Sequence, residues 1–178
     1  YLAVCLKSLA AHVACDERYR IIVMCDNVKN ITMIQLRNVI KDYENIDIEF
    51  VDIRKKMYEY SESFGQTVTD RQENRLYSGE FTLTIYFRLF IAELFPELNK
   101  AVYIDSDTVI NDDIAKLYSV DMGDAMFGAV RDTFAGKNTI LAHYIENVVG
   151  IERDEYVNSG VLLMNLDKIR QAHLAAYG

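Results

Sequence analysis

Two aspartates, Asp105 and Asp107, follow directly after a short apolar segment, residues 101–104. Residues i and i+2 of an extended segment point to the same side, so the two carboxylates are expected to share one face, roughly 7 Å apart along the chain. Two anions on one face repel each other, and a bound cation would relieve that repulsion. Because carboxylate oxygens suit Mg²⁺ or Mn²⁺, which often bind phosphate oxygens as well, the pair predicts a divalent-metal site.

The same residues fit two other interpretations. Asp and Ser are favoured in surface turns, so the segment could simply be a turn after a strand. The string DSDTV also fits the nucleophile motif of haloacid-dehalogenase-like phosphatases, in which Asp105 would attack a phosphoryl group. That motif normally lies on the first strand of its domain, whereas about 100 residues of alternating pattern precede it in this chain. The downstream string GDAMFG (123–128) also lacks a second acid at close spacing, which argues further against a phosphatase.

The segments around the aspartate pair alternate between strand-like and helix-like patterns. Short apolar or alternating runs predict strands at residues 19–25, 47–53, 101–104, 126–130 and 161–164. Apolar residues at helical spacing predict helices at residues 2–14, 31–43, 82–95, 113–118, 138–149 and from about 167 onward. This alternation predicts an α/β fold with a largely parallel sheet. In such a sheet, ligands gather at the carboxyl ends of the strands, where the two aspartates stand.

Two details of this pattern concern a helix start and a loop. Asn30 is the predicted cap of the second helix, whose predicted apolar stripe consists of Ile31, Ile34, Val39, Ile40 and Tyr43. Residues 61–80 are polar and lack a sustained period, which predicts a functional or mobile loop, with a surface excursion unrelated to any site as the alternative.

Composition limits the classes of function. The 178 residues, 51% of them hydrophobic, predict a single domain with a real core. A net charge of −8 argues against binding to nucleic acid. No apolar run approaches the roughly 20 residues of a membrane span, and no secretory signal pattern opens the sequence. Cys5, Cys15 and Cys25 match no zinc or redox motif, and we interpret them as buried thiols in a reducing compartment.

Three strings in a fixed order carry a resemblance to a known family. They are IYFRLFIAELFP (85–96), YIDSD (103–107) and YVNSGVLLMNLDKIR (156–170), and together they resemble glycosyltransferase family 8. The resemblance extends from residue 1 to the end. It implies a GT-A fold, a Rossmann-like mixed, mostly parallel sheet flanked by helices, and UDP-sugar-dependent, retaining galactosyl- or glucosyltransferase activity. It also implies that residues 1–178 form one incomplete catalytic domain, without the family's first strand and its C-terminal part.

The resemblance assigns the metal and the nucleotide to four positions. Asp105 and Asp107 match the family's metal ligands, which hold Mn²⁺, or Mg²⁺, on the diphosphate. Ser106 matches a position that contacts the nucleotide ribose. Arg88 matches an arginine that contacts the donor. Arg88 could also be an ordinary surface arginine, although its helical neighbours include no acidic partner.

The donor sugar is assigned to two further segments. Asp132, at the end of the predicted strand 126–130, matches an acid that binds the donor sugar, and it could equally only terminate that strand. Asn158, Ser159 and Gly160 match a short turn beside the reaction centre, although Asn and Gly also favour turns that have no ligand. The family's histidine metal ligand and the group nearest the anomeric carbon find no match, so no catalytic residue is assigned.

The predicted function is metal-dependent transfer of a hexose, galactose or glucose, from a UDP-sugar to a saccharide or lipid-linked saccharide, with retention. The alternatives are a phosphatase with Asp105 as its nucleophile, and a sugar-nucleotide-binding module without catalysis. The predicted partners are the UDP-sugar donor and a saccharide or glycolipid acceptor. The predicted location is the cytoplasm, with peripheral association at the inner face of the membrane through segments outside this chain.

Overall fold

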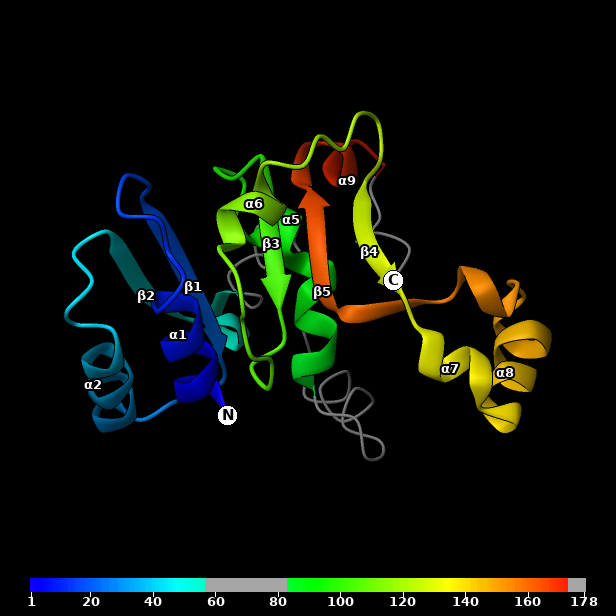
Figure 1. Cartoon of the computed structure of the whole chain (residues 1–178), viewed down its shortest axis with the longest axis horizontal. Helices are drawn as coiled ribbons and strands as arrows, with labels where there is room; N and C mark the ends of the chain where they lie inside the picture. Colours follow the sequence, from blue (N-terminus) through cyan, green and yellow to red (C-terminus); the bar gives the residue numbers. More distant parts are fainter. Residues whose placement is uncertain (57–82, 173–178) are drawn as a thin grey trace.

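The computed structural model describes residues 1–56 and 83–172 (Figure 1). The predicted loop at residues 61–80 lies outside the described residues. The predicted strand at residues 19–25 is confirmed to the residue, as β1 (Tyr19–Cys25). The other predicted strands are found with shifted ends, as β2 (Ile46–Asp52), β3 (Lys100–Ile104), β4 (Phe127–Arg131) and β5 (Val157–Asn165).

The strands of the described residues form two sheets. β1 and β2 are parallel, with Tyr19 opposite Ile46 at one end and Cys25 opposite Asp52 at the other. The second sheet has the order β3-β5-β4, and both of its strand pairs are antiparallel. The mixed α/β class is confirmed, but a majority of parallel pairs is not seen among the described strands. A continuous apolar run such as that of β5 shows that a strand is buried on both faces, and it carries no information on strand direction.

Helices flank these strands. The α-helices are α1 (Leu2–Ala10), α2 (Asn30–Val39), α5 (Ile91–Leu94), α6 (Ile114–Tyr118), α7 (Thr133–Lys137), α8 (Thr139–Tyr144) and α9 (Leu166–Ala172). The 3₁₀ helices are η1 (Leu83–Phe90) and η3 (Arg153–Glu155), and η2 (Ile145–Val149) is a π-helical turn. The single helix predicted for residues 82–95 is therefore a 3₁₀ segment, η1, followed by one α-helical turn, α5. Among the helices described, none has the length and apolar character that a transmembrane span requires.

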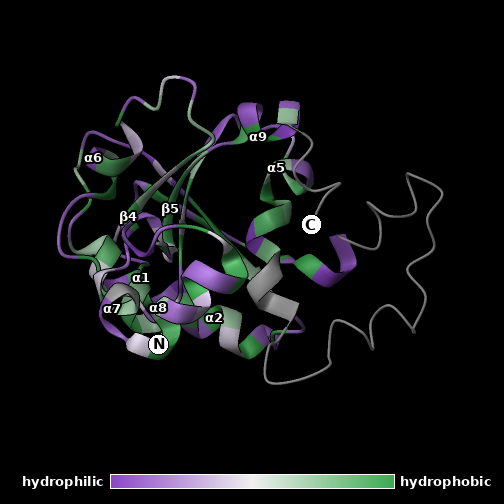
Figure 2. Ribbon diagram, turned by 90° about the vertical axis from the view of Figure 1, so that its right-hand side faces the viewer, coloured by the Kyte–Doolittle hydropathy of each residue, from purple (hydrophilic) through white to green (hydrophobic). Residues whose placement is uncertain are grey.

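Two hydrophobic clusters pack against the strands, and each draws on both sheets. The α5–α9 cluster contains Phe87, Ile91 and Ile169, with Met24 of β1 and Tyr103 of β3 packed against it. Hydrophobic residues accordingly gather in the strands and on helix α5 (Figure 2).

The α1–α2 cluster contains Leu6, Leu9 and Leu36, with Ile21 of β1 and Ile104 of β3 packed against it. Successive strand residues thus face opposite clusters, as the pleat requires. The two sheets share both clusters, and β3 therefore delivers its carboxyl end, with Asp105, from between two layers of packing.

Two predictions about local structure are wrong. Helix α2 begins at Asn30 itself, and Lys29 occupies the cap position without a side-chain cap hydrogen bond. Its buried side is formed by Leu36, together with Ile40 just after its end, whereas Ile31 and Ile34 are 59% and 54% exposed. The predicted stripe is confirmed for Val39, Ile40 and Tyr43, which belong to or pack against a core cluster. It is wrong for Ile31 and Ile34, because α2 has apolar residues on more than one side and spacing alone did not identify the covered one.

The three cysteines are all free thiols, as expected. Cys5 and Cys25 are buried, as predicted, but Cys15 is exposed. It lies in the polar segment between α1 and β1, where no core cluster covers it.

Candidate functional site

The aspartate pair lies in a turn at the carboxyl end of β3. The backbone N–H of Thr108 donates to the carbonyl of Asp105 at 3.2 Å, and Ser106 and Asp107 are exposed. The expectation that both carboxylates project from one face of an extended segment is therefore wrong, because the chain turns immediately after Asp105. The predicted turn residues and the predicted metal ligands are the same residues, so the turn does not by itself decide between the two interpretations.

Asp105 is held through one of its two carboxylate oxygens. The hydroxyl of Tyr103 donates to Oδ1 of Asp105 at 2.6 Å, and Nη2 of Arg88 donates to the same oxygen at 3.2 Å. The guanidinium of Arg88 also lies over the Tyr103 ring, 4.6 Å from its centroid. Arg88 comes from the last turn of η1, and its side chain is only 13% exposed. Arg88 thus has its acidic partner on β3 instead of on its own helix.

The segment Asn158–Gly160 is brought to the same place by an irregularity of β5. Ala129 of β4 pairs with Leu162, but the next residue, Val130, pairs with Asn158. Residues 159–161 consequently bulge away from β4. The tripeptide is therefore part of a bulged strand and not the tight turn that its composition predicted, and such bulges often occur beside active sites.

The bulge joins β5 to both Arg88 and Asp105. Nη1 of Arg88 donates to the Ser159 carbonyl and, at 3.0 Å, to the Ser159 hydroxyl. The backbone N–H of Asp105 donates to the Gly160 carbonyl at 2.7 Å. The Gly160 N–H in turn donates to Oδ1 of Asn158 at 2.8 Å. Arg88, Asp105 and residues 158–160, predicted from three separate strings, thus form one connected cluster.

Gly160 leaves space that any other residue would fill. A Cβ built on Gly160 would lie 2.9 Å from Oδ2 of Asp105 and 3.1 Å from Oδ1 of Asn158. Real Cβ atoms essentially never approach other atoms as closely as 2.9 Å, so a larger residue at position 160 would force the Asp105 carboxylate to shift. Oδ2, the oxygen that Tyr103 and Arg88 do not hold, faces this space.

The electrostatic environment keeps Tyr103 a hydrogen-bond donor. Burial raises the pKa of the Tyr103 hydroxyl, and the hydrogen bond to Asp105 raises it further, while the nearby Arg88 lowers it by a smaller amount. The negative charge of Asp107 also raises the pKa of Tyr103, as that of Asp105 does. Burial also raises the pKa of the Cys5 thiol, with a contribution from Asp107. Asp107 is therefore close enough to influence both β3 and helix α1.

Asp132 and Ser106 are not joined to this cluster by any contact of the described residues. Oδ1 of Asp132 caps helix α7, since it accepts from the N–H groups of Phe134 and Ala135 at 3.0 and 2.8 Å. Its own N–H donates to the Tyr156 carbonyl at 2.8 Å, next to the start of β5. This cap is a role that the sequence reasoning did not foresee, and a donor-sugar role for Asp132 stays a prediction. Ser106 is exposed in the turn, and its predicted contact with the ribose stays a prediction as well.

Tyr103 is the functional candidate that the sequence reasoning missed. It stands two residues before Asp105 in the same strand, at a spacing that places both side chains on one side of the sheet. A tyrosine at that spacing before an aspartate could have been recognised as a potential donor to its carboxylate.

The donor set fits a divalent cation that completes its coordination elsewhere. In the described parts of the chain, no three His, Cys, Asp or Glu side chains come together as a metal site. Asp105 and Asp107 offer carboxylate oxygens, and the Asp105 side chain is 36% exposed, with Oδ2 beside Gly160. Mg²⁺ and Mn²⁺ are commonly held by one or two carboxylates together with phosphate oxygens and water. The residues therefore fit a metal that arrives with a phosphate ligand.

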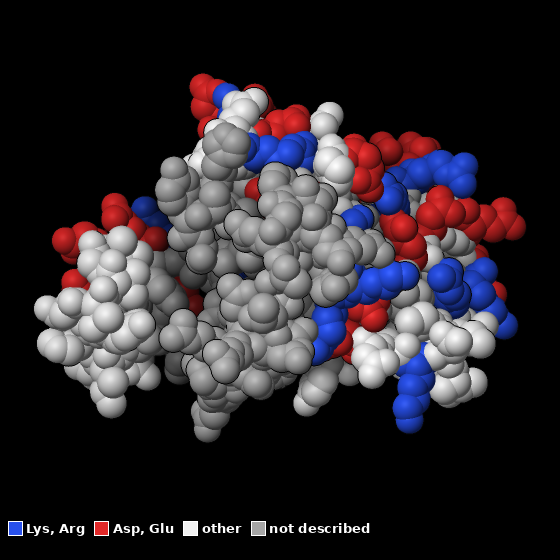
Figure 3. Space-filling view, turned by 180° about the vertical axis from the view of Figure 1, so that it is seen from behind, with Lys and Arg blue, Asp and Glu red and all other residues white. Residues whose placement is uncertain are grey.

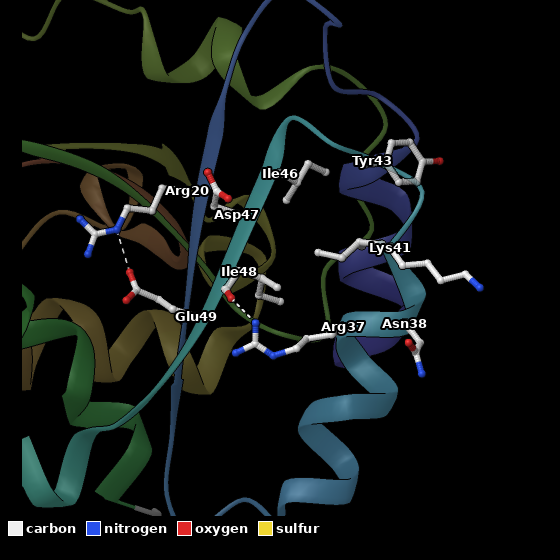
Figure 4. A pocket seen from close by; sticks show the side chains of 10 residues that line it. Arg20, Arg37, Asn38, Lys41, Tyr43, Ile46, Asp47, Ile48 and Glu49 are labelled. Atoms are coloured by element: carbon white, nitrogen blue, oxygen red, sulfur yellow. Dashed lines mark hydrogen bonds and ion pairs between the residues drawn. The ribbon is translucent and has the colours of Figure 1, made fainter.

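Other surface features do not add to this site. A hollow of about 640 Å³ lies between α2 and β2 and is lined by Arg37, Lys41 and Tyr43, among others (Figure 4). Arg37 there donates to the Ile48 carbonyl, and Arg20 is paired with Glu49. None of its lining residues belongs to the cluster around Asp105. On the described part of the face in Figure 3, acidic and basic side chains are interspersed.

Comparisons with known proteins identify the family. Glycosyltransferase GlyA of Streptococcus pneumoniae serotype 4 is 32% identical over 124 residues, which are 70% of this chain and 16% of that protein. The solved structure of galactosyltransferase LgtC in complex with donor and acceptor sugar analogs is 25% identical, with a TM-score of 0.69, over 99% of this chain and 57% of that one. The apo structure of the bifunctional glycosyltransferase WbbM is 22% identical, with a TM-score of 0.75, over 97% and 30% respectively.

These likenesses confirm the predicted GT-A-type fold. The chain spans 57% or less of the length of each of these proteins. The sequence profile described as glycosyl transferase family 8 matches residues 1–177. The chain therefore belongs to glycosyl transferase family 8.

Proposed function

We propose that this chain forms the donor-binding part of a glycosyltransferase that moves a hexose, galactose or glucose, from a UDP-sugar to a saccharide or lipid-linked saccharide acceptor. Mn²⁺, or Mg²⁺, is the proposed cofactor, held by Asp105 and Asp107. Transfer with retention of configuration is part of the proposal and rests on the family. The three free thiols fit the cytoplasmic location that belongs to the same proposal.

The observation that carries the proposal is the asymmetric setting of Asp105. One carboxylate oxygen is fixed by Tyr103 and Arg88, the other lies beside Gly160, and the side chain is 36% exposed. A carboxylate that only terminated a turn would have no need of two side-chain donors from two elements. An oxygen that is held in position and left open on one side is suited to binding a metal that carries a diphosphate.

The residues of the cluster have different proposed roles in donor binding. Asp105 and Asp107 would hold the metal, and a bound divalent ion would stabilise the leaving diphosphate as a Lewis acid. Arg88 supplies a fixed positive charge next to Asp105, and its guanidinium can donate to further anionic oxygens. Asn158, Ser159 and Gly160 line the same space from β5, where they would contact the donor sugar. The charge that develops on UDP as the anomeric bond breaks is thus opposed by groups that are already in position.

The test is the thermal stability of the chain with Mn²⁺ and UDP, added separately and together. We expect stabilisation only by the pair, by about 5–10 °C at one hundred times the dissociation constant, from the free energy that a bound ligand adds and the usual entropy of unfolding. An equal shift with UDP in the presence of EDTA would refute the metal requirement. No shift with the pair would refute the donor site.

A second measurement separates an enzyme from a binding module. Slow hydrolysis of UDP-galactose or UDP-glucose in the presence of Mn²⁺ reports cleavage of the anomeric bond without any knowledge of the acceptor. An enzyme releases UDP from its preferred donor faster than from the other, whereas a module binds UDP and releases none. Asp105→Asn provides the blank, because it removes the proposed metal ligand.

A further inference from the structure

Tyr103 occupies a central place in the cluster without belonging to any of the groups proposed to contact the donor. Its ring packs against the α5–α9 cluster, so its position is set by the core of the protein. Its other ring contact is the Arg88 guanidinium, 4.6 Å from the centroid. Its hydroxyl donates to Oδ1 of Asp105 at 2.6 Å, a short distance typical of a hydrogen bond to a charged acceptor. Tyr103 thus connects the core to Asp105.

The two donors to Asp105 share one oxygen. Oδ1 accepts from the Tyr103 hydroxyl and from Nη2 of Arg88, and no donor of the described residues reaches Oδ2. An arginine next to a carboxylate commonly binds both oxygens through two parallel N–H groups. Arg88 does not do so, because its Nη1 group is directed to Ser159 and its ring contact with Tyr103 fixes the plane of the guanidinium.

We propose that Tyr103 is a positioning residue that holds the Asp105 carboxylate through Oδ1 and thereby reserves Oδ2 for the divalent metal. This inference rests on the proposed function. Without the hydroxyl, Nη2 of Arg88 is the one remaining side-chain donor to Oδ1 among the described residues, so the carboxylate can rotate and Oδ2 loses its fixed direction. Oδ2 lies beside Gly160, and the Asp105 side chain is 36% exposed, so a metal can reach this oxygen when the carboxylate is held in place.

The experiment compares Tyr103→Phe with the parent chain. The phenylalanine keeps the ring contacts with Arg88 and with the core and removes only the hydroxyl. UDP binding is measured by calorimetry over a series of Mn²⁺ concentrations. We expect the half-saturating Mn²⁺ concentration to rise about tenfold, within the range found when an outer-sphere partner of a metal ligand is lost. At saturating Mn²⁺, UDP affinity should return to within about twofold of the parent, since a positioning defect is overcome by mass action.

The matched control is Tyr19→Phe. Tyr19 also donates its hydroxyl to an aspartate, Asp113, at 2.8 Å, but at a distance from the site and in the α1–α2 cluster. This variant loses the same kind of hydrogen bond, and it should leave the Mn²⁺ dependence unchanged. The urea midpoint of each variant shows that it is folded, and Tyr103→Leu, which keeps an apolar side chain in β3, provides a second variant with the same expected rise.

Each outcome bears on one proposal. An unchanged half-saturating Mn²⁺ concentration in Tyr103→Phe overturns the positioning role while the donor site stands. A loss of UDP affinity that saturating Mn²⁺ does not restore also overturns it, because general damage to the fold gives that result. A parent chain that binds no UDP with Mn²⁺ refutes the proposed function itself.

Discussion

Two tyrosine–aspartate hydrogen bonds in this molecule serve different purposes, and their surroundings explain why. In the first, Tyr19 of β1 donates to Oδ1 of Asp113, which also accepts from the N–H of Ala115 and so caps helix α6. The N–H of Ala14 donates to the Tyr19 hydroxyl. This hydrogen bond therefore links β1 with α6 and with the segment after α1. The other groups that bind the two side chains are backbone amides.

In the second, Tyr103 of β3 donates to Oδ1 of Asp105, whose other donor is a guanidinium and whose other oxygen borders Gly160. The same two side-chain types thus stabilise the fold where backbone amides surround them. Tyr103 and Asp105 belong to the candidate site, where their neighbours are the Arg88 guanidinium and Gly160. Residue type alone does not distinguish the two cases, whereas the neighbours of the carboxylate do.

The largest effect on UDP binding is expected for Asp105, in comparison with Asp113. Asp105→Asn keeps the shape of the side chain and an oxygen for the Tyr103 hydroxyl, but it removes the charge that a metal requires. We expect Mn²⁺-dependent UDP binding to weaken by more than about 100-fold, the upper end of the loss for outer-sphere partners. Asp113→Asn, the matched control, should bind UDP with Mn²⁺ as the parent does. Calorimetry on both variants checks this, and equal affinities would remove the distinction between the two aspartates.

A smaller effect is expected at Gly160, the glycine beside Asp105. In Gly160→Ala, the new Cβ meets Oδ2 of Asp105 at 2.9 Å, and the carboxylate can move away only at the expense of its hydrogen bonds to Tyr103 and Arg88. We expect Mn²⁺-dependent UDP binding to weaken about tenfold, or about 1.4 kcal/mol.

Gly128→Ala is the control for this variant. Gly128 also lies in a strand, and a Cβ there would meet Leu163 at 3.4 Å. Its UDP binding should stay unchanged even if its thermal stability falls slightly. If the two alanine variants bind UDP equally well, the space beside Oδ2 has no role in binding.

The smallest effect on binding is expected at Tyr19. Tyr19→Phe removes the donor to Asp113 and leaves the Ala14 N–H without its partner, so we expect the free energy of unfolding to fall by about 1 kcal/mol. UDP affinity in saturating Mn²⁺ should change by less than about twofold. Urea denaturation measures the first quantity and calorimetry the second. A variant as stable as the parent would show that this hydrogen bond contributes nothing to the fold.

The strands could be predicted better than their arrangement. Both ends of the strand at residues 19–25 are predicted correctly, because a short continuous apolar run of that length is typical of a buried strand. The antiparallel direction of β5 could not be predicted, since apolar content is the same in either direction. The exposed Ile31 and Ile34 show the same limit. The spacing of apolar residues indicates that they share a face of the helix, but it does not show whether another element covers that face.

The candidate site could be predicted as residue types but not as contacts. Asp105, Arg88 and Gly160 were each named from local strings, and the structure brings them together. The turn after Asp105 is one of the interpretations that the sequence offered, and a local hydrogen bond closes it. The bulge at residues 159–161 could not be predicted from the sequence, because it depends on pairing between distant strands. Tyr103 opens the string YIDSD, but residue type alone does not show that its hydroxyl donates to Asp105.

The bulged strand also has a consequence for how the protein is made. Arg88 and its partner Ser159 are 71 positions apart, and β3 pairs with a strand that is synthesised much later. At the usual rate of synthesis, the residues between Asp105 and Gly160 take roughly 3–10 seconds to appear. During that interval Asp105 can already pair with Arg88, but the backbone of Gly160 that anchors it does not yet exist. The proposed binding of a metal by Asp105 in its final setting would therefore require β5, and it would report that β3 and β5 have paired.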